Sequence, residues 1–403
     1  MPKNIVVIGA LDTKGPEFAF VKAAVEDRGH NPIVVNTGIM GDPPFEPDVS
    51  AARVADAGGT SLTELRQKAD RGEAIAAMTR GAALVIKDLQ EKGQVDGVLG
   101  MGGSAGTVIA TAAMRALPVG IPKVMVSTLA SADTSPYVGT RDIVMIHSVV
   151  DVAGINRISA QIYANAVGAV VGMVETALPE IAVKPLIAAS MFGNTTELVD
   201  RCREILEDKG FEVLVFHATG TGGRTMESLI ADGYFAGVLD VTTTEWADEV
   251  VGGVLSAGPE RLNAAAELNI PQIIVPGCVD MANFWAPSTV PEKYSDRRFY
   301  EWSPNVTLMR TTPEENMEIG RILAEKVNQS EGPVAVFLPL LGVSQLDSPG
   351  GEFWWPEADK ALFETIKEHT REEIIVHELD NNINDPAFAE AVTGKLLSFL
   401  GKE

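Results

Sequence analysis

Four segments in the first half of this sequence recur, in the same order, in its second half. Each contains a short apolar run of the length and composition that predict a buried β-strand. The pairs are 31–38 with 212–220, 95–100 with 235–240, 121–127 with 270–276, and 142–147 with 305–310. An ordered repeat of this size predicts two copies of one supersecondary arrangement. We therefore expect two α/β domains of related topology, with functional residues at corresponding turns.

The length of the chain agrees with this division. Because 403 residues exceed what one ordinary core accommodates, we place an N-terminal α/β domain at 1–180 and a C-terminal α/β domain at 181–403. Strands that alternate with helices predict Rossmann-like or flavodoxin-like parallel sheets. The first domain carries a helical insertion at 39–94, which is either a lid or interface arm or a longer crossover packed on the sheet. The second domain carries an aromatic loop insertion at 281–303.

The formal net charge of -23 restricts the partners of the chain. Nucleic acids and membrane surfaces attract basic patches, so we expect neither as a partner. Cys202 and Cys278 lie far apart in the sequence and predict no disulfide framework, which favours a reducing, cytoplasmic setting. We also find no signal-peptide pattern at the N-terminus and no apolar run of the ~20 residues that a membrane span requires.

A glycine-rich stretch, 95–107, begins with the second of the repeated segments and runs beyond it. Four glycines fall within seven residues after a short apolar run, and small helix formers follow, which predicts strand, tight turn and helix. The amides at the helix N-terminus would suit a phosphate. The candidate binding residues are Gly102, Gly103, Ser104, Ala105, Gly106 and Thr107. The alternative is a turn that only packs the helix against the sheet; no Gly-Lys-Ser/Thr follows to make it a Walker A loop.

The first predicted strand covers residues 4–9. The loop that follows it carries Asp12, Thr13 and Lys14. Loops at the carboxyl ends of parallel strands converge, so Lys14 can supply a charged donor near the glycine turn. Asp12 can hold Mg²⁺ through water, because Mg²⁺ commonly uses few carboxylates together with phosphate oxygens. The alternative is that Asp12 caps the first helix and Lys14 is solvated.

A second group of chemically versatile residues follows the predicted strands of the C-terminal domain. The candidate catalytic residues are His217, Arg224, Glu245, Cys278 and Asp280. An arginine beside a Gly-Thr-Gly-Gly turn suits a carboxylate or phosphate. His217 with Asp280 or Glu245 would form a base and its orienting group. Cys278 would be a nucleophile if a histidine lay beside it, and a buried small apolar residue otherwise.

Four motifs carry a family resemblance: Gly9-Ala-Leu-Asp-Thr-Lys14, Gly100-Met-Gly-Gly-Ser-Ala-Gly-Thr107, His217-Ala-Thr-Gly-Thr-Gly-Gly-Arg224 and Pro276-Gly-Cys-Val-Asp280. In these motifs the chain resembles the ATP-binding domain family named after the tomato tobamovirus-multiplication inhibitor. The resemblance extends over the whole chain. It implies a two-domain, nucleotide-binding α/β protein whose ligand is ATP.

Two functions fit these expectations. One is an enzyme that binds ATP with Mg²⁺ and acts on a small acidic or phosphorylated metabolite at the cleft between its domains; the other is a non-catalytic, ATP-binding regulatory or scaffold protein. A dinucleotide oxidoreductase is disfavoured, because the glycine turn follows the third strand and residues 115–132 contain no Asp or Glu to bind a ribose. The insertion at 39–94 and an apolar helix at 151–175 exceed what one sheet needs to cover its faces, which predicts a homo-oligomer.

Overall fold

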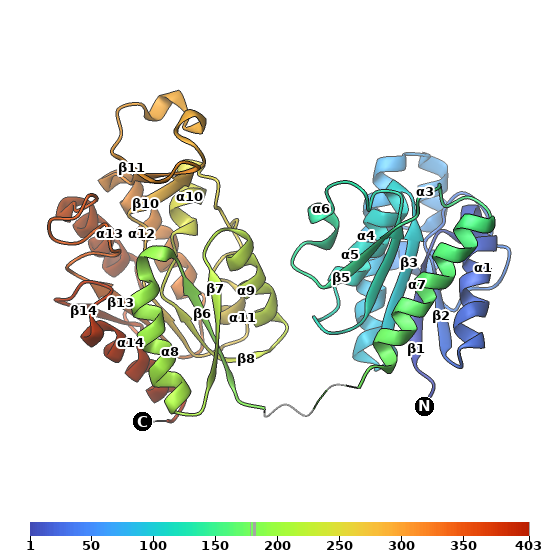
Figure 1. Ribbon diagram of the computed structural model, residues 1–403, viewed down its shortest axis with the longest axis horizontal. Helices are drawn as coiled ribbons and strands as arrows, with labels where there is room; N and C mark the ends of the chain where they lie inside the picture. The colour runs from blue at the N-terminus through green and yellow to red at the C-terminus, as the bar shows by residue number, and fades with distance from the viewer. Residues whose placement is uncertain (178, 180–182, 403) are drawn as a thin grey trace. The chain divides into compact units, whose positions relative to one another are not determined.

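The computed structural model describes residues 1–177, 179 and 183–402. The chain forms two compact units, residues 1–180 and 181–403, hereafter the first unit and the second unit (Figure 1). Each unit is a parallel β-sheet with helices on both faces. The expected fold class, two Rossmann-like or flavodoxin-like α/β domains, is therefore confirmed.

The first unit is built on a five-stranded parallel sheet. Its strands are β1 (Asn4–Gly9), β2 (Asn31–Asn36), β3 (Gly97–Gly102), β4 (Lys123–Ser127) and β5 (Ile143–His147), in the order β2-β1-β3-β4-β5. β3 and β4 are buried along their whole length, which is typical of parallel strands covered on both faces. This order places a topological switch point between β1 and β3, where the chain leaves the two strand ends toward opposite faces of the sheet.

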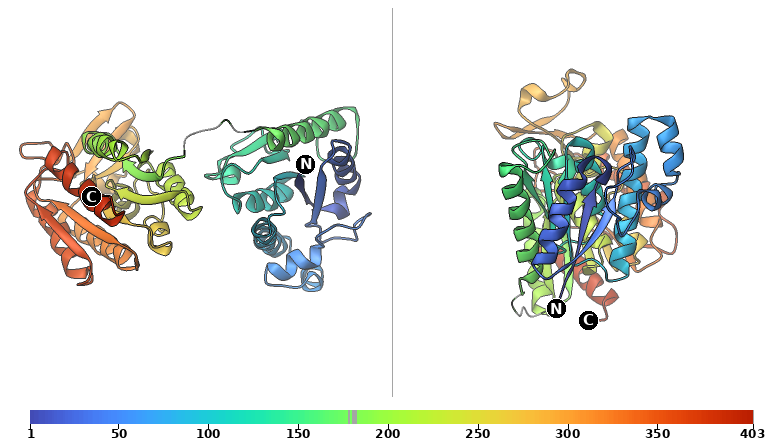
Figure 2. Two further views of the ribbon diagram at one scale, coloured as in Figure 1. Left: turned by 90° about the horizontal axis from the view of Figure 1, so that it is seen from below. Right: turned by 90° about the vertical axis from the view of Figure 1, so that its right-hand side faces the viewer.

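Helices cover both faces of this sheet (Figure 2). They are α1 (Leu11–Asp27), α2 (Ala51–Ala57), α3 (Leu62–Lys68), α4 (Arg71–Glu91), α5 (Ser104–Arg115), α6 (Ser135–Val138) and α7 (Arg157–Glu175). α1 and α7 bury Phe18, Val21 and Val170 against one face. α2, α4 and α5 bury apolar side chains against the other. The insertion at 39–94 thus contains a long crossover packed on the sheet, since Met78 and Ile86 of α4 lie in that core.

The second unit has a six-stranded parallel sheet and a small antiparallel one. The parallel strands are β6 (Leu186–Met191), β7 (Glu212–His217), β8 (Phe235–Asp240), β9 (Gln272–Ile274), β13 (Val334–Pro339) and β14 (Ile375–Leu379). Their order is β14-β13-β9-β8-β6-β7, which is the order of the first unit with one strand added at the far edge. The antiparallel strands are β10 (Met281–Phe284), β11 (Phe299–Ser303) and β12 (Val306–Arg310). The corresponding switch point lies between β6 and β8.

The helices of the second unit again divide between two faces. α8 (Thr196–Asp208) and α14 (Pro386–Phe399) pack on one face. The other face is covered by α9 (Thr221–Ala231), α10 (Glu245–Val251), α11 (Ala264–Glu267), α12 (Pro313–Asn328) and α13 (Pro356–His369). Three 3₁₀ segments complete the fold: η1 (Gly193–Thr195), η2 (Pro287–Thr289) and η3 (Glu292–Tyr294).

Three of the four predicted repeat pairs occupy equivalent positions in the two sheets. β7, β8 and β9 take the places of β2, β3 and β4. The backbone agrees in detail, because the Val98 amide donates to the Pro122 carbonyl at 2.8 Å and the Val238 amide donates to the Pro271 carbonyl at 2.9 Å. The duplication therefore extends to single hydrogen bonds between neighbouring strand segments.

The fourth repeat pair was predicted wrongly. Segment 305–310 does not provide the fifth parallel strand; it forms β12, which pairs antiparallel with β10 and β11, and β13 takes the fifth position. Two residues separate β11 from β12. A strand partner that close in sequence forms a hairpin at small entropic cost. An apolar run of five residues fits either sheet, so local pairing decided its place.

Candidate functional site

The N-terminus of α5 lies at the switch point of the first unit and has no side-chain cap. In the described part of the chain, no hydrogen-bond acceptor meets the amides of Ser104, Ala105 or Gly106. Ser104 is exposed and the next two residues are partly exposed, so water or a ligand reaches these amides. Three unpaired N–H groups at the positive end of a helix dipole attract an anion.

Two glycines of this turn are explained by packing. A Cβ at Gly100 would lie 2.8 Å from the Ala110 Cβ, and a Cβ at Gly102 would lie 2.8 Å from the Gly106 Cα. These glycines let α5 lie close against β3. The packing alternative is therefore correct for this part of the turn.

Gly103 has no such explanation. A Cβ at this position would have the Thr128 Oγ1 as its nearest neighbour, at 3.8 Å. Its φ of -79° is open to any L-residue. A side chain here would enter the open space beside the α5 amides. Strand–turn–helix sites that bind phosphate leave a position of this kind free.

Thr107 stabilises the turn through hydrogen bonds to Gly103 and Ser127. Its amide donates to the Gly103 carbonyl at 2.8 Å, and its buried hydroxyl contacts the same carbonyl and the Ser127 Oγ, at 2.8 and 2.6 Å. The polar groups of Thr107 are thus engaged within the chain. Thr107 holds the amides of its neighbours in place.

Among the described helices of the first unit, α1, α5 and α6 have no side-chain cap at the N-terminus, whereas the other four do. Side chains of Ser50, Ser61, Asp70 and Asn156 accept first-turn amides at the N-termini of α2, α3, α4 and α7. Such caps stabilise a helix by about 1 kcal/mol. α5 is longer than α2 and α3 but lacks one, and it is the helix that begins at the switch point after β3.

Asp12 and Lys14 lie in the first turn of α1, a segment that the sequence indicated as loop. Asp12 does not cap α1; its Oδ2 accepts the amides of Met40 and Gly41, at 2.6 and 3.2 Å, and thereby holds the loop after β2. Its Oδ1 is buried without a hydrogen-bond partner. This oxygen faces the loop after β2, since a Cβ at Gly38 would lie 2.2 Å from it.

Lys14 is not simply solvated. Its Nζ donates to the Val152 carbonyl, in the loop that follows β5. Lys14 has non-helical dihedral angles and marks a kink in α1. Thr13 precedes it with an exposed side chain. The ammonium therefore lies at the carboxyl edge of the sheet, where strand-end loops converge.

In the second unit, the glycine turn before α9 already binds an anion that belongs to the chain. Glu245 Oε1 accepts the amides of Gly220 and Gly223, at 2.7 and 3.1 Å. Its Oε2 accepts Arg261 Nε at 2.7 Å. The predicted carboxylate or phosphate at this turn is thus the Glu245 carboxylate, with Arg261 as its partner.

Arg261 was missed by sequence reasoning. It is 1% exposed and binds Glu245, Asp240 (Nη2 to Oδ1, 2.6 Å) and Glu227 (Nη1 to Oε1, 3.1 Å). Burial raises the pKa of the Glu227 carboxyl despite this contact. Asp240 at the end of a buried strand was a signal that a cation must lie near, but nothing in the sequence identified which one.

The other predicted catalytic residues do not gather around this centre. His217 is exposed at the end of β7, and no hydrogen bond or ion pair of its ring is found in the described residues. Arg224 is exposed and donates to the Ser256 carbonyl at 3.0 Å. Within the described chain, neither Glu245 nor Asp280 accepts a bond from His217. The predicted pairing of His217 with a carboxylate is therefore not formed.

Cys278 and Asp280 lie in a separate buried cluster after β9. Burial raises the pKa of the Cys278 thiol well above its ordinary value, and the negative charge of Asp280 adds to the effect. The sulfur is thus a thiol, which is a poor nucleophile. Burial raises the pKa of Asp280 to about 7, with a further contribution from Asp347. The hydroxyl of Ser344 donates to Asp280 Oδ2 at 2.9 Å.

Neither a metal centre nor a membrane-spanning helix is found in the described ranges. No group of three His, Cys, Asp or Glu side chains is arranged to hold a metal ion. No helix there is long and apolar enough to cross a membrane. Any Mg²⁺ bound at Asp12 would therefore need ligands from water and phosphate.

The chain belongs to the uncharacterised protein family UPF0261. Residues 3–179 match the N-terminal domain of that family and residues 184–400 match its C-terminal domain. A UPF0261 protein of Clostridium tetani is 52% identical over the full length of both chains. The protein UPF0261 RA0729 of Rhizobium meliloti is 48% identical over 96% of this chain and 97% of its own length.

The plant relative suggested by the sequence motifs is also found. The ToMV resistance protein Tm-1(GCR237) of Solanum lycopersicum is 41% identical over 82% of this chain, which corresponds to 45% of the plant protein. The expected family resemblance is thereby confirmed. A solved UDP-N-acetylglucosamine 2-epimerase from Rickettsia bellii is 12% identical over 99% of this chain and 96% of its own, with a TM-score of 0.24, and supports no inference about function.

Proposed function

We propose that the first unit of this UPF0261 protein binds the phosphates of a nucleotide, ATP, at the carboxyl edge of the sheet between β1 and β3. The observation that carries the proposal is the uncapped N-terminus of α5 at the switch point, with the unpaired amides of Ser104, Ala105 and Gly106 around the open space at Gly103. Parallel sheets bind ligands at this place because two loops diverge there.

Charged groups at the same carboxyl edge of the sheet would complement those amides. A chain with a net charge of -23 repels ATP at long range, so the site requires local positive charge. Lys14 would leave the Val152 carbonyl for a phosphate oxygen, a stronger, charge-assisted hydrogen bond. Asp12 Oδ1 would hold Mg²⁺ through water; the ion would neutralise phosphate charge. Thr13 lies exposed in the first turn of α1, next to Lys14, and is the third residue of this proposed binding segment.

The test is a pair of glycine-to-valine variants. Gly103→Val places a branched side chain where phosphate oxygens would lie, roughly 3 Å from the amides, and should abolish ATP binding in a calorimetric titration. Because a Cβ at Gly103 meets only open space, the fold should survive. Gly172→Val is the matched control, since a Cβ at that glycine of α7 has no atom within 4 Å and, like one at Gly103, makes no close contact.

The outcomes separate a binding turn from a structural one. Wild-type ATP affinity in Gly103→Val would show that the turn does not cradle phosphate. Lys14→Ala should weaken binding more mildly, by about 1–3 kcal/mol, through loss of one charge-assisted bond. A melting curve of each variant without ligand checks that it is folded.

A second candidate function is ATP binding without turnover, as in a regulatory or scaffold protein. It is favoured by the second unit, where Glu245 is held by Arg261 and two amides and Cys278 is a protonated thiol. The competing candidate is an enzyme that acts on a small acidic or phosphorylated metabolite. ATP consumption measured with and without a metabolite mixture distinguishes them, because only an enzyme would consume ATP faster when its metabolite is present.

We also propose a cytoplasmic homo-oligomer. The two buried, unpaired cysteines agree with a reducing compartment. β5 is an edge strand of the first unit on which Val144 is 41% exposed, and such an edge offers unpaired backbone groups to another chain. Light scattering should give a mass above the monomer value of 42.8 kDa; the monomer mass at micromolar concentration would contradict the proposal.

A further inference from the structure

The outer edge of β14 has no strand partner in the part of the chain that the structure describes. β14 is the last strand of the six-stranded sheet, and β13 is its neighbour on the inner side. The Leu340 amide donates to the Leu379 carbonyl at 2.9 Å, so the backbone of Leu379 faces β13. Because backbone groups alternate in direction along a strand, those of Val376 and Glu378 face outward. Among the described residues, neither forms a backbone hydrogen bond outside the strand pair. The edge thus offers N–H and C=O groups to another extended segment.

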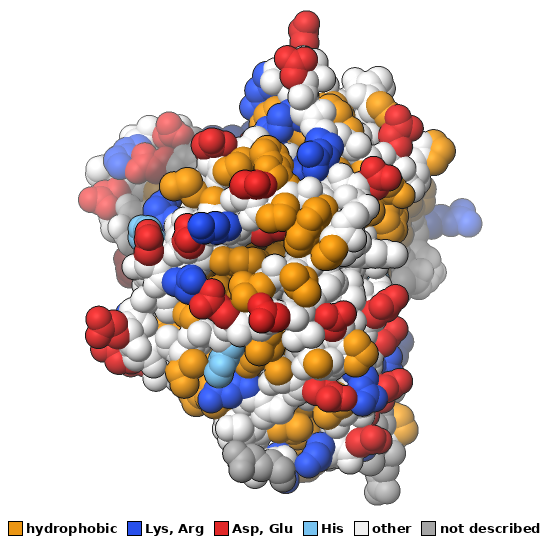
Figure 3. All heavy atoms as spheres, turned by 90° about the vertical axis from the view of Figure 1, so that its left-hand side faces the viewer, with side chains coloured by type: hydrophobic (Ala, Val, Ile, Leu, Met, Phe, Trp, Pro, Cys, Tyr) orange, Lys and Arg blue, Asp and Glu red, His pale blue; other side chains and the backbone are white. Residues whose placement is uncertain are grey.

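An exposed apolar side chain lies on this edge. Ile375, the first residue of β14, is 51% exposed. At β7, the opposite edge of the same sheet, the apolar side chains are buried or partly buried. Figure 3 shows the side of the second unit that carries β14 and α13, where apolar side chains gather near the centre between acidic and basic ones. Of the two edges of this sheet, β14 is therefore the one that presents apolar surface to a partner.

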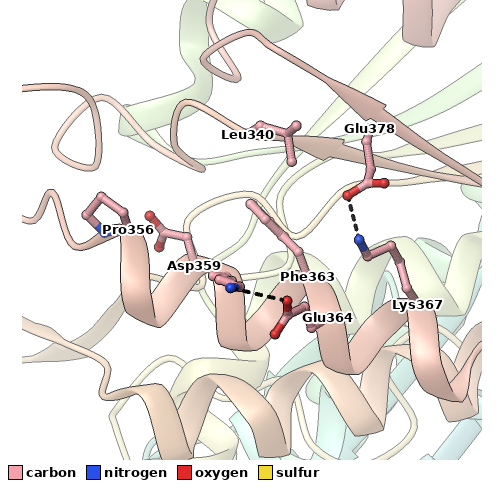
Figure 4. Close-up of a pocket in the computed structure, with 8 residues that line it drawn as sticks. Leu340, Pro356, Asp359, Phe363, Glu364, Lys367 and Glu378 are labelled. Atoms are coloured by element: carbon pink, nitrogen blue, oxygen red, sulfur yellow. Dashed lines mark hydrogen bonds and ion pairs between the residues drawn. The ribbon is translucent and has the colours of Figure 1, made fainter.

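A cavity of about 260 Å³ lies beside this edge, between α13 and the carboxyl ends of β13 and β14 (Figure 4). Leu340, Pro356 and Phe363 provide an apolar lining, and Glu378 of β14 forms part of the wall. The volume is below the range of about 300–1,000 Å³ that is usual for ligand pockets, so a single apolar side chain suits it better than a whole ligand. A residue of an added strand that lies beside Glu378 would point to the same face of the sheet and reach this cavity.

Carboxylates surround the edge. Glu372 and Glu373 precede β14 and Asp380 follows it; all three are exposed, and none forms an ion pair in the described ranges. Glu378, within the strand, pairs with Lys367 of α13 at 2.7 Å, as Figure 4 shows. A second copy of this chain would bring the same carboxylates against these, and like charges on facing strands are destabilising. The charges therefore protect the edge from self-pairing and favour a basic partner.

We propose that the β14 edge binds an extended peptide segment in which an apolar residue is flanked by lysine or arginine residues. The segment adds a seventh strand to the sheet through hydrogen bonds to the outward backbone groups of Val376 and Glu378. Its apolar side chain enters the cavity beside α13, and its basic ends lie against Glu373 and Asp380. Main-chain hydrogen bonds supply affinity, whereas the cavity and the carboxylates supply specificity. This proposal is independent of nucleotide binding by the first unit.

The experiment is calorimetric titration of the full chain with the synthetic peptide acetyl-Lys-Lys-Val-Leu-Val-Lys-Lys-amide. One control peptide carries glutamate in place of each lysine. The other carries N-methyl groups on its three central residues, which removes the N–H groups that a strand requires. We expect saturable one-to-one binding that weakens as the salt concentration rises, and affinities for both controls that are lower by about tenfold or more. Equal affinity for either control would overturn the proposal, as would no saturable binding of the first peptide.

Hydrogen exchange tests the location without any change to the protein. The peptide should slow exchange at the amides of Val376 and Glu378, because both would donate to it. Unchanged exchange at these two amides in the saturated complex would place the peptide elsewhere and refute the assignment. Light scattering distinguishes a second copy as the occupant: a dimer that is lost in Ile375→Lys, together with no peptide binding, would make the edge an interface between copies and would also overturn the proposal.

Two variants complete the test. Val376→Pro removes an outward N–H without removing a hydrogen bond to β13, so peptide affinity should fall by about tenfold. Ile375→Lys replaces the exposed apolar side chain with a cation and should weaken binding by about fivefold. Met317→Lys makes the same exchange at a side chain of α12 that is also 51% exposed, and should bind as the wild type does. A melting curve checks that each variant is folded. Undiminished binding in folded Ile375→Lys and Val376→Pro would contradict strand addition at β14.

Discussion

The two sheets have the same strand order, yet their helix N-termini are treated in opposite ways. In the first unit the first three amides of α5, those of residues 104–106, have no acceptor from the described chain. In the second unit the amides at the start of α9 are bonded to the Glu245 carboxylate, which Arg261 holds from the other side. One site is open to an external anion and the other is filled by an internal one.

The difference shows how one topology serves two purposes. Gly100 in β3 corresponds to Asp240 in β8, by position in the repeated segments. Glycine at position 100, inside β3, lets α5 approach the strand. Aspartate at the same place carries a buried charge and requires Arg261. The first choice leaves the edge without a charged group, and the second converts that edge into a buried ionic core of the second unit.

The largest expected effect comes from breaking that ionic core. Arg261→Met removes the guanidinium that binds two buried carboxylates and the partly buried Glu227, so the second unit should lose about 3–5 kcal/mol of stability. Urea unfolding followed by tryptophan fluorescence measures this unit selectively, because all five tryptophans lie between residues 246 and 355.

The matched control is Arg224→Met, at an exposed arginine beside the same glycine turn. It should change stability by less than about 0.5 kcal/mol. Equal effects of the two variants would show that the three-carboxylate cluster contributes no more than an ordinary surface arginine.

The strands were predictable from the sequence, whereas the ionic clusters were not. Runs such as Ile5 to Ile8 are β-branched and fully buried, and their periodicity is local information. The partners of Arg261 come from α9, β8 and α10, so their proximity depends on tertiary packing. No spacing in the sequence encodes it.

The glycine turns illustrate the same limit at the candidate site. Both were predicted as candidate anion-binding turns, and the second one does bind a carboxylate, that of Glu245. The sequence did not indicate that Glu245, 25 positions away from Gly220, would be that carboxylate. β12 was misplaced for a related reason: an apolar run of five residues does not specify which sheet it joins.

The second-largest effect concerns the internal anion itself. Glu245→Ala leaves two buried amides of the α9 turn without their acceptor and should cost about 1–3 kcal/mol. It should also expose an anion site like that of α5. We expect inorganic phosphate to raise the melting temperature of Glu245→Ala more than that of the wild type; an equal rise in both would show that the turn binds no external anion.

A pH titration compares the two units through their carboxyls. Burial raises the pKa of Asp248 in the second unit to about 7, although Asn283 donates two hydrogen bonds to it. The folded state thus binds a proton more tightly than the unfolded chain, whose aspartate titrates near about 3.9. Stability from this group is complete below about pH 4 and falls by up to about 1.4 kcal/mol per unit until about pH 7.

The first unit should show the opposite sign. There the carboxyl pKa values that shift are lowered. An example is Glu64, whose pKa is lowered mainly by the hydrogen bond from the Ser61 amide. The stability that Glu64 contributes to the folded first unit is therefore lost as the pH falls. Asp248→Asn should flatten the loss of second-unit stability between pH 5 and pH 7, as measured by tryptophan fluorescence. An unchanged slope in that variant would mean that Asp248 is not the responsible group.

The smallest effect tests the comparison most directly, by giving the first unit the solution found in the second. Gly103 is the N-cap of α5 and has extended dihedral angles and open space around its Cβ position. Gly103→Asp places a carboxylate over the unpaired amides, so it should stabilise the ligand-free first unit by about 0.3–1 kcal/mol. The same carboxylate should repel the phosphates of ATP.

Gly103→Asn supplies a similar cap without charge and separates the two effects. Both variants should melt at a slightly higher temperature than the wild type in circular dichroism, and ATP should raise the melting temperature of Gly103→Asp least. If ATP raises the melting temperature of Gly103→Asp as much as that of the wild type, the α5 amides do not bind its phosphates, and the open edge of the first unit differs from the filled edge of the second only in packing.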